Sequence, residues 1–170
     1  MRIIKLSGDE IITLNDFPVH NEHILKIYFL VYQKNCGDIL SPCPVMHKNL
    51  VLKHFSLKLK KILEPFFVEN LKAKYFLLDG SHRTTAACLT KNKINAMVIK
   101  SEKDIREAKS LAQSGEHLQC LLDATIKKII ADLIKHFEKK SYFETVEQKT
   151  RRMVAEKVIP KYMILNYKRK

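Results

Sequence analysis

The sequence is poor in the features that mark flexible linkers, secreted proteins and membrane spans. Its 170 residues include only 4 glycines and 5 prolines, which argues against long low-complexity segments. No apolar run approaches the roughly 18 residues that a membrane-spanning helix needs, and the first residues carry acids where a signal peptide would be apolar. We therefore expect a cytoplasmic protein of one domain, or one domain with a helical appendage, and no membrane partner.

The cysteines also lack the spacing of a metal or redox site. Cys36, Cys43, Cys88 and Cys120 lie far apart, and no CxxC pair occurs among them. A disulfide framework is not expected in a chain of this size without a secretion signal. We expect free thiols that are buried or half-buried.

Acidic residues are scarce towards the end of the chain. Residues 127–170 hold 13 of the 31 Lys and Arg but only 5 of the 18 Asp and Glu, so most of the net charge of +13 lies there. Such a skew suits a polyanionic partner, for example nucleic acid bound through residues 127–170. It is equally typical of a solvated helical surface, and the composition leaves both interpretations open.

The apolar pattern of the first half predicts short strands and a long helix. Residues 2–6 and 10–14 are typical of a hairpin or of two short strands. Residues 22–34 are apolar on most faces and predict a buried helix, with Asn21 as its N-cap. The prolines within residues 37–46 exclude a helix there and allow an edge strand.

The middle of the chain predicts a strand–turn–helix–strand unit. Helical spacing favours a helix over 49–63, which Pro65 would end. Residues 74–78 and 94–99 are typical of strands, and a helix from about 82 to 91 lies between them. We expect this unit to be of the parallel type.

The last third predicts three more helices. A capping box at residues 101–104 opens the first, and a regular apolar stripe predicts the second over 117–139. The third covers 144–157 and stops before Pro160. We expect the stripe of the second helix to form core or a dimer contact, so a homodimer is an option.

The stretch Asp79-Gly80-Ser81-His82-Arg83 gathers several chemical groups at the top of a strand. Gly80 allows a sharp turn and close approach of a ligand, and the next amides would be the unpaired donors of a helix first turn. Arg83 adds a bidentate fork that suits phosphate. Asp79, at the carboxyl end of its strand, could hold a metal ion beside that phosphate. The stretch therefore predicts a phosphate site with a divalent-ion ligand.

A simpler interpretation of the same residues stays open. Asp79 could cap the helix, His82 could be a surface residue, and Arg83 could pair with an acid. The small residues from Thr84 to Ala87 keep the helix slim in either case, so that it can lie close to the sheet.

The sequence LLDGSHRTTAA resembles the signature of the ParB/sulfiredoxin-like superfamily, Gly-x-x-Arg-x-x-Ala, often written Asp-Gly-x-His-Arg. It matches at Asp79, Gly80, His82, Arg83 and Ala86. Members of this superfamily share a nucleotide or phosphate at this turn.

The resemblance covers roughly residues 10–100, including the proline-containing segment before the motif strand. It implies an α/β (mixed) fold with a small ParB/sulfiredoxin-like sheet core in residues 1–100. Residues 101–170 would then form a helical, basic C-terminal subdomain.

Individual members of the superfamily differ at the motif. Sulfiredoxin needs a cysteine where this chain has Ser81, and a hydroxyl cannot replace a thiolate in its chemistry; Cys88 lies two turns further along. The free-serine kinases are more similar, with Asp-Gly-His-His-Arg and a catalytic glutamate before their first long helix. Glu22 has that placement here, although Ser81 replaces the first histidine and residues 47–73 are longer than the corresponding link.

The resemblance thus implies a nucleotide-binding phosphotransferase, an ATP- or ADP-dependent kinase that uses Mg²⁺ and acts on a small hydroxylated substrate. Glu22 would accept the proton of the substrate hydroxyl, and could instead be an ordinary acid of a helix first turn. The residues implied are Glu22, Asp79 and His82 for catalysis, Asp79 for the metal, and Gly80, Ser81, His82, Arg83 and Thr84 for the phosphates.

Two other functions remain in view. One is a ParB-like nucleic-acid-binding protein or a nuclease-like domain with the nucleotide as a switch. ParB proteins usually have Arg where this chain has His82, and residues 102–157 show no clear helix-turn-helix pattern. The other is an interaction module that keeps the fold without chemistry.

Overall fold

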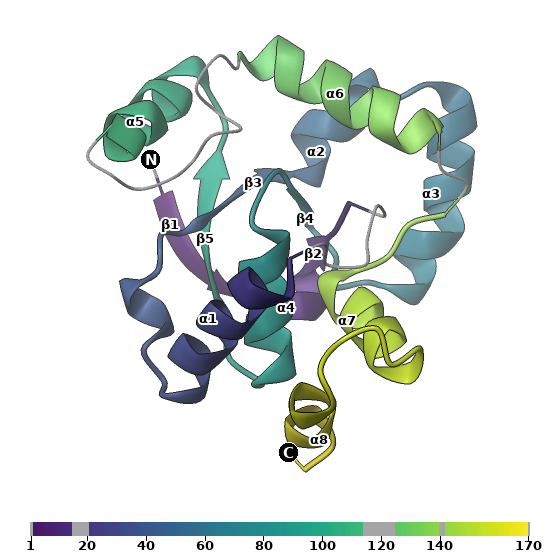
Figure 1. Cartoon of the computed structure of the whole chain (residues 1–170). Coiled ribbons are helices and arrows are strands. Elements are labelled where there is room, and N and C mark those ends of the chain that lie inside the picture. The colour runs from purple at the N-terminus through teal and green to yellow at the C-terminus, as the bar shows by residue number, and fades with distance from the viewer. Residues whose placement is uncertain (1, 15–20, 114–124, 140–141, 170) are drawn as a thin grey trace.

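A single mixed sheet organises the protein. The computed structural model describes residues 2–14, 21–113, 125–139 and 142–169. Within these ranges the strand order is β1-β5-β3-β4-β2 (Figure 1). The strands are β1 (Arg2–Leu6), β2 (Ile11–Ile12), β3 (Cys43–His47), β4 (Tyr75–Leu77) and β5 (Ile94–Ile99). The expected α/β (mixed) class is confirmed.

The first two strands lie at opposite edges of the sheet. β1 pairs with β5 in antiparallel fashion, whereas β2 pairs with β4 in parallel. A short 3-10 turn, η1 (Gly8–Glu10), separates them. Of the two options that the sequence left, two separate strands are therefore correct and a hairpin is not.

The strand that contains Pro44 is central, so the expected edge strand is wrong. β3 lies between β5, to which it is parallel, and β4, to which it is antiparallel. The carbonyl of Pro44 accepts from the amide of Leu78 at 3.0 Å. The N–H and C=O of one strand residue point to the same side. The donor that Pro44 lacks would therefore face the end of β4, and the proline interrupts no interior part of the ladder.

The unit around the motif is antiparallel, not parallel as expected. β3 lies between β4 and β5 and fixes them in opposite directions. Leu77, the last residue of β4, pairs with Val45, which pairs with Val98 near the end of β5. The turn before helix α4 (Ser81–Leu89) lies against Cys43, which pairs with Ala96 and not with the last residues of β5.

Local capping signals predicted two helices well. Helix α1 (Glu22–Gln33) begins after Asn21, whose side chain accepts from the amide of Ile24 at 3.1 Å. Helix α5 (Glu102–Gln113) begins with the expected capping box. In that box the amide of Ser101 donates to Asp104 at 2.9 Å, and the amide of Asp104 donates back to the Ser101 hydroxyl at 3.3 Å.

The predicted helix over 49–63 is two helices, and Pro65 does not end the second. α2 (Lys48–Val51) and η3 (Leu52–His54) precede α3 (Leu57–Glu69), which begins where the Ser56 hydroxyl accepts from an amide. Leu63 and Phe66 are buried on either side of Pro65. Their burial, worth about 1.5–3 kcal/mol each, offsets the roughly 3 kcal/mol that an interior proline costs.

The C-terminal helices are only partly as expected. α6 (Ile126–Glu138) begins after Thr125, its N-cap, and confirms the later part of the predicted 117–139 helix. The earlier part and Cys120 lie outside the described residues. α7 (Val146–Ala155) matches the predicted 144–157 helix. α8 (Lys161–Arg169) was not predicted. Pro160 precedes it, and the carbonyl of Pro160 accepts from amides in the first turn of α8, so this proline starts a helix.

Each face of the sheet is covered by helices (Figure 1). Helices α3, α5 and α6 pack on one face, where the core includes Met46, Phe76 and Phe137. Helices α1, α4, α7 and α8 pack on the other, against Val45 and Ala96. Both cores draw on residues from each side of residue 100, and the domain division there stays a prediction.

The core also holds two of the cysteines. Cys43 and Cys88 are buried free thiols, as expected, whereas Cys36 is exposed. Within the described ranges no helix is both long and apolar enough to span a bilayer.

Candidate functional site

The candidate site is built on a left-handed glycine. Gly80 is the N-cap of α4, with φ +100° and ψ 29°. Its Cα faces β3 so closely that an added Cβ would lie 2.6 Å from Sγ of Cys43. Both the backbone angle and the lack of space require glycine. The sharp turn that the sequence predicted is therefore present.

The backbone amides of the first turn of α4 point towards the N-terminal end of the helix. The first backbone bond that closes the helix runs from the amide of Thr84 to the carbonyl of Gly80, at 2.9 Å. The amides of Ser81, His82 and Arg83 precede it, and an α-helix offers such amides no carbonyl of its own. The helix dipole adds partial positive charge at this end. Ser81 and His82 are themselves partly exposed.

The guanidinium of Arg83 lies beneath this turn. Its side chain is only 7% exposed, and Nη2 lies 3.7 Å from the carboxylate of Asp79. Nη1 donates to the carbonyl of Ser41, in the segment that leads into β3. Arg83 thus ties the start of α4 to that segment, and these contacts use part of a group with five N–H donors. Arg83 therefore pairs with an acid, as the simpler interpretation of the sequence predicts.

Asp79 lies on the bend between β4 and α4 and remains accessible. Its side chain is 42% exposed although it pairs with Arg83. The N-cap position belongs to Gly80, which has no side chain to accept a bond, so Asp79 is not the cap of the helix. One carboxylate therefore faces solvent beside the first-turn amides of α4.

Thr84 contributes to the turn from inside. It is 1% exposed, and its hydroxyl donates to the carbonyls of Gly80 and Ser81 at 3.0 and 3.1 Å. The Thr84 hydroxyl therefore stabilises the first turn of α4 from the buried side. Its amide likewise donates inward, to Gly80.

Glu22 belongs to a different neighbourhood. It is exposed at the first residue of α1. Together with burial, its negative charge raises the pKa of Tyr162 in α8. Within the described residues no ion pair joins Glu22 to Arg83. The structure thus groups residues 79–84, whereas Glu22 lies at the contact of α1 with α8.

Sequence reasoning missed the residues that surround Arg83. Ser41 accepts its hydrogen bond, and the buried Cys43 lies against Gly80. Burial raises the pKa of the Cys43 thiol to about 11, although the Arg83 cation opposes the shift. Cys43 is therefore a neutral thiol at pH 7 and no nucleophile. The only signal in the sequence was the pair of prolines that flank it.

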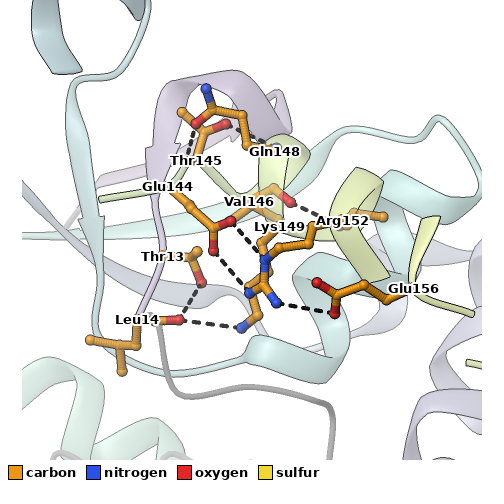
Figure 2. A network of polar contacts seen from close by, with 10 residues as sticks. Thr13, Leu14, Glu144, Thr145, Val146, Gln148, Lys149, Arg152 and Glu156 are labelled. Atoms are coloured by element: carbon orange, nitrogen blue, oxygen red, sulfur yellow. Dashed lines mark hydrogen bonds and ion pairs between the residues drawn. The ribbon is translucent and has the colours of Figure 1, made fainter. Parts of the chain in front are cut away.

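The basic end of the chain is partly committed to internal contacts. Figure 2 shows Arg152 between Glu144 and Glu156, with two of its nitrogens 2.9 and 3.0 Å from the Glu144 carboxylate. The amine of Lys149, 1% exposed, donates to the carbonyl of Leu14 at 3.3 Å. Lys149 thus links α7 to the chain just after β2, and Arg152 links the two ends of α7 to each other. Lys149 is therefore buried away from any nucleic acid, whereas Arg152 is partly exposed and other Lys and Arg of residues 127–170 are exposed.

Comparison of the chain with protein families, with curated proteins and with solved structures gives no match. The case for a function consequently depends on the residues and on their geometry.

Proposed function

We propose that the protein is a nucleotide-binding phosphotransferase that holds the phosphates of ATP or ADP at the Gly80–Arg83 turn. One observation carries the proposal: a left-handed glycine opens α4 directly above a buried guanidinium and beside an accessible carboxylate. The backbone N–H donors, the fixed positive charge and a carboxylate that can bind a metal ion come together in five consecutive residues.

The phosphate contacts follow from this geometry. A phosphate on the turn would accept hydrogen bonds from the amides of Ser81, His82 and Arg83, because the left-handed Gly80 starts the helix there and leaves its positive end towards the ligand. The guanidinium of Arg83 lies within 3.3 Å of the point that a Cβ of Gly80 would occupy. Held there by Ser41, it supplies positive charge without first having to be ordered.

The residues present fit a magnesium ion that arrives with the nucleotide. Mg²⁺ is usually held by one or two carboxylates together with substrate phosphates and water, and Asp79 offers one such carboxylate. The described residues contain no group of three or more His, Cys, Asp or Glu that could hold a metal by itself. When bound, the ion would neutralise charge on the phosphates.

The acceptor of the phosphoryl group would be a small molecule with a hydroxyl. In this proposal Glu22 would accept the proton of that hydroxyl from the start of α1. The substrate would then extend from the contact of α1 with α8 to the first turn of α4, where His82 would contact the transferred phosphate. Glu22 is exposed and therefore available to a substrate. Phosphoryl transfer depends mostly on positioning and charge, so the proposal calls for only a few protein groups.

The test is the magnesium dependence of nucleotide binding by calorimetry. Asp79→Asn keeps the shape of the side chain and removes its charge. The variant should bind ATP as the parent does without Mg²⁺ and should lose the gain in affinity that Mg²⁺ gives the parent. Asp38→Asn is a matched control, because Asp38 is an exposed acid paired with Lys5 at 2.9 Å. If the parent binds neither ATP nor ADP, the proposal fails.

A further inference from the structure

A second pocket lies at the opposite end of β3 from the Gly80 turn. It has a volume of about 360 Å³ and is lined by His47, Asn49, Leu50, Lys53, Tyr75, Val98, Ile99 and Lys100. The parallel strands β3 and β5 both end here. Open α/β sheets hold their ligands at the carboxyl ends of parallel strands.

This pocket is separate from the site of the proposed function. Cys43, at the start of β3, lies against Gly80. His47 is four residues further along the strand, which corresponds to roughly 13 Å at the rise of a β-strand. A ligand in the pocket would therefore not contact the Gly80 turn.

One wall of the pocket is aromatic and fixed. His47 and Tyr75 are cross-strand neighbours on β3 and β4. Their rings pack edge to face with centroids 5.2 Å apart. Nδ1 of His47 accepts from the amide of Asn49 at 3.2 Å, which holds the imidazole in place. A rigid aromatic wall of this kind suits stacking of a flat ring.

The rim of the pocket is positively charged. Lys53 and Lys100 line it and are exposed, and none of the eight lining residues is acidic. Burial lowers the pKa of His47, and the positive charges of Lys48, Lys100 and Lys74 lower it further, so the imidazole is neutral at pH 7. Lys48 is engaged by the ring of Phe67, 4.1 Å from its amine.

The first two acids that follow Lys100 in the sequence bind backbone amides and not the lysine ammonium groups of the rim. Glu102 accepts from the amide of Ile126 at 2.8 Å. Asp104 accepts the amides of Lys100 and Ser101 at 2.9 Å and so caps helix α5. Exposed ammonium groups on flexible stems bind phosphate as point charges, whereas planar carboxylates favour arginine. The charge pattern therefore favours a phosphate group on the ligand.

We propose that this pocket binds a phosphate ester that carries a flat ring, with the ring against His47 and Tyr75 and the phosphate between Lys53 and Lys100. Such a group is either a free mononucleotide or one nucleotide of a single strand. The site lies outside the Gly80 turn and is not needed for the proposed phosphotransferase activity.

A titration followed by amide resonances of the full chain tests the two sites separately. Amides of Asn49, Lys53 and Lys100 report on the pocket, and those of Ser81 and Arg83 report on the turn. AMP should shift the pocket amides. Adenosine and inorganic phosphate should each bind there about tenfold more weakly or worse, because each makes only part of the contacts.

The double variant Lys53→Gln/Lys100→Gln should weaken AMP binding at the pocket amides by about tenfold or more. The same variant should leave any response of the turn amides unchanged. Lys58→Gln/Lys93→Gln is the matched control, because both lysines are exposed and neither lines the pocket. The control should bind AMP as the parent does.

A strand of eight adenylates identifies the source of the ligand. Binding about tenfold tighter than AMP, with the same sensitivity to the double variant, assigns the pocket to single-stranded nucleic acid; equal affinity assigns it to a free nucleotide. The proposal is overturned if AMP at about 5 mM moves none of the pocket amides, or if the double variant binds AMP as tightly as the parent.

Discussion

The turn at Gly80 makes a sharp prediction about stability. Gly80→Ala places a methyl group at a φ of +100° and 2.6 Å from Sγ of Cys43. The left-handed backbone costs a non-glycine residue about 1–2 kcal/mol, and overlap in a packed interior costs about 1–3 kcal/mol. The free energy of unfolding should therefore fall by about 2–5 kcal/mol in total.

A second substitution separates the two contributions. Cys43→Ala removes the sulfur atom that the new methyl group would meet. In that background Gly80→Ala should cost only the backbone strain, about 1–2 kcal/mol. The coupling between the two changes should thus be about 1–3 kcal/mol in a double-mutant cycle. Urea unfolding followed by circular dichroism is the assay, since the chain has no tryptophan.

Gly8 provides the matched control. A Cβ there would meet Sγ of Cys88 at 2.3 Å, but the φ of Gly8 is not positive. In a Cys88→Ala background, Gly8→Ala should therefore lack the backbone cost that Gly80→Ala retains. A coupling between Gly80→Ala and Cys43→Ala below about 0.5 kcal/mol would refute the close approach of the two residues.

Two further predictions concern the helices of the second half. Arg152→Lys loses the two-pronged contact with Glu144 and should lower the free energy of unfolding by about 1 kcal/mol, whereas Arg151→Lys should change nothing measurable by urea unfolding. The second prediction concerns Asp104 at the start of α5. Burial raises the pKa of this carboxyl, but hydrogen bonds from Lys100 and Ser101 outweigh that effect and lower the pKa below its ordinary 3.8. The stability that this carboxylate contributes is therefore present above that value and lost as the pH falls through the lower folded pKa. Asp104→Asn should remove this part of the acid dependence, and an unchanged dependence would contradict the cap.

Local signals in the sequence predicted those parts of the fold that depend on neighbouring residues. Asn21 and the Ser101–Asp104 capping box define helix starts through hydrogen bonds between residues three apart in the chain. The local sequence is therefore sufficient to predict where these helices begin. The turn at Gly80 is also a local feature. A glycine between an apolar strand and a helix indicates a sharp left-handed turn, because glycine adopts a positive φ without steric cost.

Contacts between distant segments were beyond the sequence pattern. The central position of β3 depends on pairing with β4 and β5, and no local feature shows that Pro44 faces the end of a neighbour. The burial of Arg83 depends on Ser41, 42 residues earlier in the chain. Pro65 stays inside α3 because the packing of its neighbours outweighs its local preference.

The central claim is that nucleotide phosphates bind the amides at the start of α4. The most direct measurement is a titration of the ¹⁵N-labelled protein with ADP and Mg²⁺, followed by amide resonances. The account predicts that the amides of Ser81, His82 and Arg83 shift together and saturate with one dissociation constant. If ADP at about 5 mM leaves these three amides unchanged, or shifts only amides elsewhere, the phosphate site at the Gly80 turn is contradicted.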